Sequence, residues 1–399
     1  MNTHPASPLK PMTWIFAVLA SAALSSHAQS WETLVALGEP NADAIGHAVM
    51  LDPFSPDPAH PDLFIGGESP GGSVLQVDLS VEPAAASASD AAPGLMHHLV
   101  ADAFGNLYAA GYQSRGGRAY WQVRRSSNGG ASWVVVDDAQ AWNKDGGSVA
   151  YGLTTDLTGN VYASGSAHDR QGKEFWVIRR GANQGQNWAT VYKSSKPLAK
   201  GMGAAYVGPT AAHAGGVFAV GTLTATRTTQ WSVLRSRDSG GTWQWVDAWN
   251  ATRDNEGAQY PRAVAADGAG NVYVAGYDVI GVPAWYVRRS LDGGETWQTI
   301  LSEYADGDYN RADDIAADPW GNVYVVGMTK QAGSGAQWTI RRWDAATQSW
   351  DQWPNELRHP LASWASVSVA RGVVSDAFGR VYITGSADGQ WIVQRLAVP

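Results

Sequence analysis

Short apolar segments alternate with polar, glycine-containing turns along the chain. Five turns follow the pattern Asp-x-x-Gly-Asn/Arg-hydrophobic-Tyr, and a Gly-Asn turn between two apolar runs is a common β-hairpin signal. The five turns occupy residues 102–108, 156–162, 267–273, 318–324 and 376–382, and weaker copies end at Phe64 and Phe218. The aromatic residues that end the copies are separated by 44 residues (64 to 108) up to 58 residues (324 to 382). This spacing predicts seven structural units.

Each unit contains two further apolar segments that begin with tryptophan. The first tryptophan opens a third strand in six units, at Trp121, Trp176, Trp231, Trp285, Trp338 and Trp391. The second follows a tight turn and opens a fourth strand in five units, at Trp133, Trp188, Trp243, Trp297 and Trp350. Four antiparallel strands per about 50 residues, repeated around an axis, are the blade of a propeller. We therefore expect an all-β fold, a seven-bladed β-propeller with four-stranded blades.

The two ends of the chain complement each other. The last unit stops after its third strand, at residues 390–396, and no apolar segment follows it. The missing fourth strand is found near the N-terminus, where residues 30–35 match the fourth strand at 241–246. The pattern predicts that the N-terminal strand completes the last blade and so removes open sheet edges. Residues 29–399 are expected to form a single domain.

The first residues of the chain have the pattern of an export signal. Lys10 supplies a positive charge, residues 14–24 are apolar but too short to span a bilayer, and Ser26-His27-Ala28 has small residues at the cleavage positions. We expect residues 1–28 to be a signal peptide and the protein to be secreted or periplasmic. No later apolar run approaches the ~18 residues of a membrane helix, so no membrane partner is expected.

Charge and composition narrow the function further. The formal net charge of −8 argues against a nucleic-acid partner, and the absence of Cys excludes disulfides, thiol chemistry and thiolate metal sites.

Arginine recurs at one position of the third strand, which predicts ion pairs between blades rather than a basic ligand patch. The repeated residues are Arg124, Arg179, Arg235, Arg288, Arg341 and Arg395.

Candidate functional residues lie where the repeat changes from unit to unit. The first strand of each blade lines the central channel, and loops from all blades converge at one channel mouth. Five residues before the end of each first strand stand His47, His97, Tyr151, Val207, Arg262, Asp313 and Arg371. Six of these seven are ionisable, whereas the residues two positions further on are all apolar. We expect the six to converge at the channel mouth as candidate catalytic residues, with a solvated ring of no function as the alternative.

Neighbouring loops supply candidate ligand-binding residues. Trp142 lies near Asp145, and Trp249 precedes a charged loop; indole rings beside hydrogen-bonding groups often hold sugar rings. Arg311 and Asp314 flank Asp313. Residues 306–310 read Asp-x-Asp-x-Asn, a pattern of Ca²⁺ ligands, but they lack the Gly and Glu of an EF-hand. We therefore predict no cofactor and no metal, with Ca²⁺ as a minor alternative.

The turns between third and fourth strands carry a recognisable motif. Residues 236–243 and 290–297 resemble the Asp box, Ser/Thr-x-Asp-x-Gly-x-Thr-Trp, of the sialidase superfamily and related glycan-active propellers. The resemblance implies a group of arginines that binds a carboxylate, for which the candidates are Arg262, Arg371 and Arg311. It also implies Tyr151 as the nucleophile and Asp313 as the acid. The sialidase Arg-Ile-Pro signature is absent, sialidases have six blades, and no Glu is placed to activate Tyr151.

A second resemblance is to seven-bladed polysaccharide lyases, which use His and Tyr as base and acid and Arg to neutralise a uronate carboxylate. His47, His97 and Tyr151, with Arg262 or Arg371, fit those roles by residue type. We expect an exported propeller that binds a carbohydrate, above all an anionic polysaccharide, at the channel mouth, as a polysaccharide lyase or glycoside hydrolase. The alternative is a non-catalytic exported scaffold that binds a protein or glycan partner.

Overall fold

The computed structural model describes residues 31–37, 45–57, 60–69, 72–81, 84–90, 92–138, 147–195, 206–207, 216–224, 229–250, 259–279, 282–304, 309–330, 335–350, 368–387 and 389–396. The signal peptide predicted at residues 1–28 lies outside these ranges. Within them, no helix is both long and apolar enough to cross a membrane.

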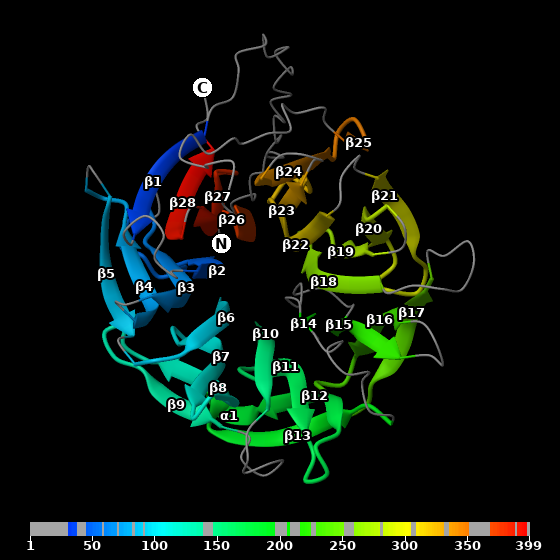
Figure 1. Ribbon diagram of the computed structural model, residues 1–399, viewed down its shortest axis with the longest axis horizontal. Helices are drawn as coiled ribbons and strands as arrows, with labels where there is room; N and C mark the ends of the chain where they lie inside the picture. Colours follow the sequence, from blue (N-terminus) through cyan, green and yellow to red (C-terminus); the bar gives the residue numbers. More distant parts are fainter. Residues whose placement is uncertain are drawn as a thin grey trace, which may run out of the picture.

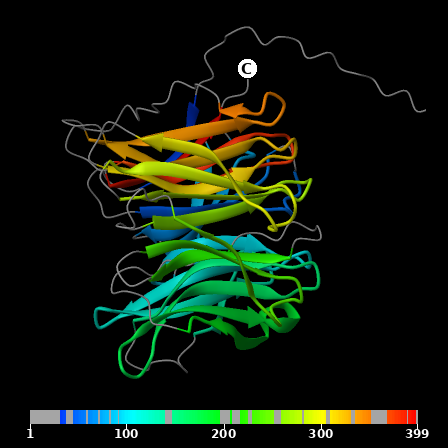
Figure 2. The same cartoon turned by 90° about the vertical axis from the view of Figure 1, so that its right-hand side faces the viewer.

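Seven four-stranded antiparallel sheets are arranged around a central axis (Figure 1), so the predicted seven-bladed propeller is confirmed. Seen from the side, the strands run between the two faces of the disc (Figure 2). Blade 1 contains β2 (Ile45–Leu51), β3 (Leu63–Ser69), β4 (Gly72–Asp78) and β5 (Ala85–Asp90). Blade 2 contains β6 (Leu95–Ala101), β7 (Leu107–Arg115), β8 (Arg118–Ser126) and β9 (Val134–Asp137). Blade 3 contains β10 (Val149–Thr155), β11 (Val161–His168), β12 (Glu174–Gly181) and β13 (Asn187–Lys193), with the four-residue turn α1 (Ala182–Gly185) before β13.

The remaining blades repeat this order, from the innermost to the outermost strand. Blade 4 contains β14 (Tyr206–Val207), β15 (Val217–Thr224), β16 (Thr229–Ser236) and β17 (Gln244–Trp249). Blade 5 contains β18 (Gln259–Ala266), β19 (Val272–Asp278), β20 (Ala284–Ser290) and β21 (Gln298–Tyr304). Blade 6 contains β22 (Tyr309–Ala317), β23 (Val323–Lys330), β24 (Ala336–Asp344) and β25 (Ser349–Trp350). Blade 7 contains β26 (Val369–Ser375), β27 (Val381–Ala387) and β28 (Gln390–Leu396), and its outermost strand is β1 (Trp31–Leu37).

Closure of the ring follows the prediction. Strand β1 pairs antiparallel with β28, from Trp31 opposite Leu396 to Leu37 opposite Trp391. The side chain of Val35 is buried in a cluster formed mainly by blade 1 and blade 7, so β1 also contributes to the seam between the two blades. The first and last described strands of the chain are therefore held in one sheet.

The Asp-x-x-Gly turns are structural elements of the hairpins between first and second strands. In blade 2 the carboxylate of Asp102 accepts hydrogen bonds from the backbone N–H groups of Phe104 and Asn106, each at 2.9 Å. The hydroxyl of Tyr108 donates to the same carboxylate at 2.9 Å. The equivalent Tyr-to-Asp bond recurs in blades 3, 5 and 6. In these four blades the motif thus links the turn to the strand that follows it.

The blades pack through aromatic side chains and through buried ion pairs. All six third-strand Trp residues are at most 2% exposed. Four of the six repeated Arg residues reach back to an acidic residue on the outermost strand of the preceding blade, which confirms the interblade prediction for these four. The pairs are Arg124–Asp90, Arg179–Asp137, Arg288–Asp247 and Arg341–Glu303.

Two of the repeated arginines make a different contact. Arg395 pairs with Glu32 of β1 inside blade 7, at 2.7 Å, so the interblade prediction is wrong there. Arg235 pairs with Glu295 of the following blade, blade 5, at 3.0 Å, so its ion pair also joins two blades, as predicted. The pairing register explains both contacts. Arg235 stands opposite Phe218 and Arg395 opposite Tyr382, whereas Arg124 stands one residue earlier, opposite Ala109. Consecutive residues of a strand point to opposite faces of the sheet, so these two arginines face away from the preceding blade.

Candidate functional site

A β-bulge lies at the same place in six of the seven innermost strands. The pairing register shifts between Gly46 and Ala48, Met96 and His98, Ala150 and Gly152, Pro261 and Ala263, Ala312 and Asp314, and Ala370 and Gly372. The bulged residues are those that the repeat comparison singled out: His47, His97, Tyr151, Arg262, Asp313 and Arg371. A bulge interrupts the alternation of a strand and turns one side chain in a new direction. Val207, the apolar member, belongs to β14, for which only two residues are described.

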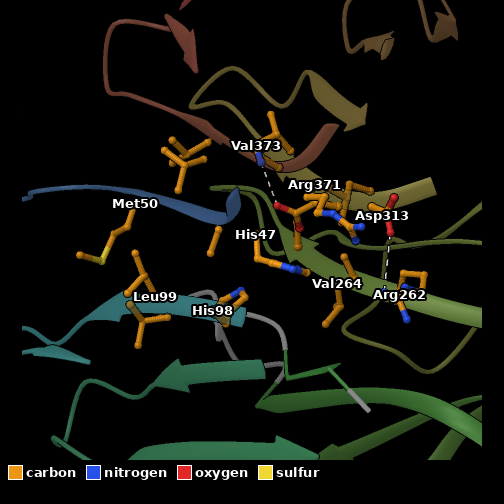
Figure 3. Close-up of a pocket in the computed structure, with 18 of the residues that line it drawn as sticks. His47, Met50, His98, Leu99, Arg262, Val264, Asp313, Arg371 and Val373 are labelled. Atoms are coloured by element: carbon orange, nitrogen blue, oxygen red, sulfur yellow. Dashed lines mark hydrogen bonds and ion pairs between the residues drawn. The ribbon is translucent and has the colours of Figure 1, made fainter. Parts of the chain in front are cut away.

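Five of the six bulged residues line one cavity of about 320 Å³ (Figure 3). They are His47, His97, Arg262, Asp313 and Arg371, which come from five different blades. Tyr151 adjoins them, because its ring centroid lies 5.1 Å from that of His97. The structure therefore brings all six candidates together, as the spacing of the repeat predicts.

The aromatic side of this site consists of two imidazoles and a phenol. The ring centroids of His47 and His97 are 4.8 Å apart in an edge-on contact. Burial lowers the pKa of His97 to about 3, with smaller effects from Arg262 and Arg371, and burial likewise lowers the pKa of His47 well below its ordinary value. Both imidazoles are therefore neutral at pH 7, and each offers one hydrogen-bond donor and one acceptor.

The opposite side of the site concentrates positive charge. Arg311 Nε lies 2.9 Å from Asp313 Oδ2, and Arg262 Nη2 lies 3.7 Å from Asp313 Oδ1. Arg371 lines the same cavity, and its charge lowers the pKa of both His47 and His97. Two guanidinium groups lie beside the carboxylate of Asp313 and a third lines the same cavity, so positive charge exceeds the charge of this carboxylate and suits an anionic ligand.

Hydrogen bonding in this cluster is incomplete. Among the described residues, the buried Nη2 of Arg311 has no hydrogen-bond partner, and Oδ1 of Asp313 accepts no hydrogen bond. A buried polar atom without a partner costs about 1–3 kcal/mol, so such groups usually have a ligand or water beside them. The arrangement is suited to holding a carboxylate by two or more guanidinium groups.

Asp314 follows the bulge of β22 and also lines the cavity. Its Oδ2 accepts a hydrogen bond from the backbone N–H of Val373 at 2.9 Å, which links blade 6 to blade 7. Burial raises the pKa of Asp314 to about 7, and the negative charge of Asp313 adds to this effect. The ordinary alternation of a strand would place two consecutive side chains on opposite faces; the bulge allows both Asp313 and Asp314 to line the cavity.

His98 is a site residue that the repeat comparison missed. It lies one residue beyond the bulge of β6, lines the cavity, and has a pKa that burial lowers to about 4. Its Nδ1 is buried without a hydrogen-bond partner among the described residues. The signal in the sequence was the pair His97-His98, but a strict two-residue alternation assigns the second histidine to the opposite face.

The other predicted ligand-binding residues do not line this cavity, although Arg311 adjoins it through its ion pair with Asp313. Trp142 and Asp145 are outside the described residues, as are positions 306–308 of the suggested Ca²⁺ loop. Trp249 packs edge-on against Trp231 and Tyr286, and Arg288 lies over its ring at 4.7 Å, so it forms part of the contact between blades 4 and 5. No group of three or more His, Asp or Glu side chains in the described part of the chain is placed to hold a metal ion.

The raised pKa of Asp314 predicts an unusual pH dependence of stability. Because the folded state holds the proton more tightly than the unfolded state, Asp314 makes folding less favourable as pH rises from about 4 to about 7. Asp314→Asn removes this penalty and keeps an acceptor for Val373. Relative to the unsubstituted protein, its free energy of unfolding should therefore rise over this interval, by at most about 4 kcal/mol.

Chemical denaturation at pH 4, 5.5 and 7.5 measures the effect. Asp292→Asn is the matched control, since hydrogen bonds from Thr296 and Ser290 hold the pKa of Asp292 below its ordinary value. The stability of that variant relative to the unsubstituted protein should change little between pH 4 and 7.5, because the carboxyl of Asp292 ionises below this interval in the folded and the unfolded protein. A parallel pH dependence in Asp314→Asn and the unsubstituted protein would contradict the raised pKa.

Comparison with known proteins shows the fold but no family. No protein-family model matches the chain, and no curated protein matches it in sequence. An oligogalacturonate lyase in complex with manganese is similar in structure over 93% of this chain and 98% of the other, with a TM-score of 0.57 and 9% identity. The GH74 xyloglucanase of Xanthomonas campestris matches 91% of this chain and only 53% of its own, with a TM-score of 0.56 and 15% identity. The Hadza microbial sialidase Hz136 matches 93% and 97% of the two chains, with a TM-score of 0.52 and 12% identity.

The similar structures thus include several carbohydrate-active propellers at low identity. The WD40 propeller domain of Doa1, with a TM-score of 0.54, is about as similar, and identities this low establish the fold alone. What the fold and site define is a seven-bladed β-propeller whose innermost strands enclose a cavity lined by arginine and histidine side chains.

Proposed function

We propose that this protein binds an anionic carbohydrate, such as a uronate-containing polysaccharide, at the channel mouth. The observation that carries the proposal is that Arg262 and Arg371 line one cavity together with the carboxylate of Asp313, to which Arg311 is ion-paired. Guanidinium groups recognise carboxylates by paired, charge-assisted hydrogen bonds. The similarity to carbohydrate-active propellers supports a glycan as the molecule that bears this carboxylate.

The same proposal includes the features that relate to export. Residues 1–28 are a cleaved signal peptide, and the turns at 236–243 and 290–297 are Asp boxes that stabilise hairpins on the face opposite the site. An exported location brings the protein to extracellular polysaccharide. Sequencing the exported protein from its N-terminus tests the first point, because it should begin at Gln29.

A catalytic role is supported by the neutral imidazoles beside the arginines. In a β-elimination, an imidazole such as that of His97 would remove the proton from the carbon next to the carboxylate. The electron pair of that C–H bond forms a C=C bond, the neighbouring C–O bond breaks, and the departing oxygen takes a proton from Tyr151. The arginines would stabilise the negative charge that develops on the carboxylate.

Ligand binding would adjust the basicity of the histidines. In the free site, burial and the charges of Arg262 and Arg371 lower the pKa of His97, which makes its imidazole a weak base. A bound carboxylate offsets those positive charges and raises the imidazole pKa toward neutrality. Proton removal would then be favoured only when an anionic ligand is in place.

Screening the purified protein on anionic polysaccharides tests the proposal. We expect binding by calorimetry to a polyuronate such as polygalacturonate, and no binding to its fully methyl-esterified form, which lacks the carboxylates. Absorbance of unsaturated uronate identifies a lyase, new reducing ends without that absorbance identify a glycoside hydrolase, and binding without cleavage identifies the non-catalytic scaffold. Equal binding to the charged and the esterified polymers contradicts the role of the arginines.

A further inference from the structure

The position that directly follows the bulged residue carries different kinds of side chain in different innermost strands. The residue after the bulge is Ala48, His98, Gly152, Ala263, Asp314 or Gly372 in the six bulged strands. Four of these six are Ala or Gly. A Cβ built on Gly372 would lie 3.1 Å from the backbone of Ala48, which shows how crowded the position is in blade 7. His98 and Asp314 are the two large polar side chains at this level, and both line the cavity.

From this juxtaposition we propose that His98 and Asp314 form a hydrogen-bonding subsite for the hydroxyl groups of the bound sugar. The inference rests on the function proposed above. It assigns two parts of one ligand to two successive positions of the innermost strands, the bulged position and the one after it. The arginines at the mouth hold the carboxylate, and the two residues below hold the uncharged part of the same ligand.

The hydrogen-bonding state of His98 supports this assignment. The buried Nδ1 of its imidazole has no partner among the described residues, although a buried ring nitrogen normally has one. A neutral imidazole presents one donor and one acceptor, and a sugar hydroxyl can satisfy either. Figure 3 shows His98 among the residues that surround the cavity, on the strand that also carries His97.

Asp314 complements His98 from blade 6. One of its oxygens is occupied by the N–H of Val373, and in its protonated form the carboxyl also supplies an O–H donor. With burial holding both groups in their uncharged forms in mildly acidic solution, the lower level adds no charge that competes with the arginines. Above pH 7 the ionised Asp314 loses its donor and repels an anionic ligand.

Calorimetric titration with two probes tests the subsite. Digalacturonate carries carboxylates and hydroxyls, whereas benzoate carries a carboxylate on a ring without hydroxyls. We expect His98→Ala to weaken digalacturonate binding about tenfold, which corresponds to one lost hydrogen bond, and to leave benzoate binding unchanged. His98→Asn, which restores a donor and an acceptor, should recover most of the lost affinity.

Further measurements separate the subsite from a structural role. His60→Ala alters an exposed histidine that pairs with Asp57 and should change neither affinity. The affinity of the unsubstituted protein for digalacturonate should fall above pH 7, and Asp314→Asn should abolish that fall. Equal loss of both probes in His98→Ala, or no loss of either, overturns the subsite alone. Failure of the unsubstituted protein to bind digalacturonate overturns the proposed function, and the subsite with it.

Discussion

Deleting residues 31–37, the whole of β1, should abolish the cooperative unfolding transition of this protein. The deletion removes the ladder of pairs with β28, the ion pair of Glu32 with Arg395, and the buried side chain of Val35. At about 0.5–1.5 kcal/mol per hydrogen bond and 1.5–3 kcal/mol for a buried valine, the loss is about 5 kcal/mol or more. The free energy of unfolding of a single domain is only about 5–15 kcal/mol, so the deletion should remove most of it.

The deletion also leaves β28 as an open edge, which promotes aggregation. Thermal unfolding followed by circular dichroism and light scattering records both effects. A synthetic peptide of residues 29–38, added in trans, is the matched control and should restore part of the transition, because it supplies the missing strand without a covalent link. A deletion variant that melts within a few degrees of the full chain would contradict closure by β1.

The architecture was predictable because the propeller repeats both its turns and its packing. Each Asp-x-x-Gly turn is a local device, with the Asp carboxylate bound by the N–H groups two and four residues later, so its pattern can be read without tertiary information. Closure was predictable for the same reason, since a blade that lacks its fourth strand must obtain one elsewhere. The interblade prediction failed at Arg395, because this residue stands one position later in its strand than Arg124 and so faces the other side of its sheet.

The candidate site was predictable in part because the bulges are themselves part of the repeat. Counting back a fixed number of residues from the end of each first strand found the bulged positions without any knowledge of the bulge. The role of the next residue was not predictable, because the bulge changes the direction of the strand in a way that residue types do not reveal. His98 was therefore missed, and the contact between Asp314 and blade 7 was not foreseen. Trp249 was assigned to the ligand although its ring packs between blades, since an indole suits both environments.

Replacing the cavity arginines should separate binding from folding. Arg262→Ala and Arg371→Ala should each weaken the binding of polygalacturonate by roughly 10–100-fold, because a hydrogen bond to a charged group contributes about 1.5–3 kcal/mol. Both side chains border the cavity, and Asp313 keeps its contact with Arg311 when Arg262 is lost. The melting temperature should therefore change little, in contrast to the β1 deletion.

Salt and charge-conserving variants sharpen this prediction. The affinity of the unsubstituted protein should fall as ionic strength rises, and it should fall less steeply in the alanine variants, because fewer cationic contacts are left to screen. Arg262→Lys and Arg371→Lys keep the positive charge but cannot form the bidentate hydrogen bonds of a guanidinium group, so each should recover only part of the affinity. Arg237→Ala is the matched control: this exposed arginine pairs with Glu295 outside the cavity, and its loss should not affect binding. Unchanged affinity in both Arg262→Ala and Arg371→Ala would show that the channel mouth is a solvated ring without a binding role.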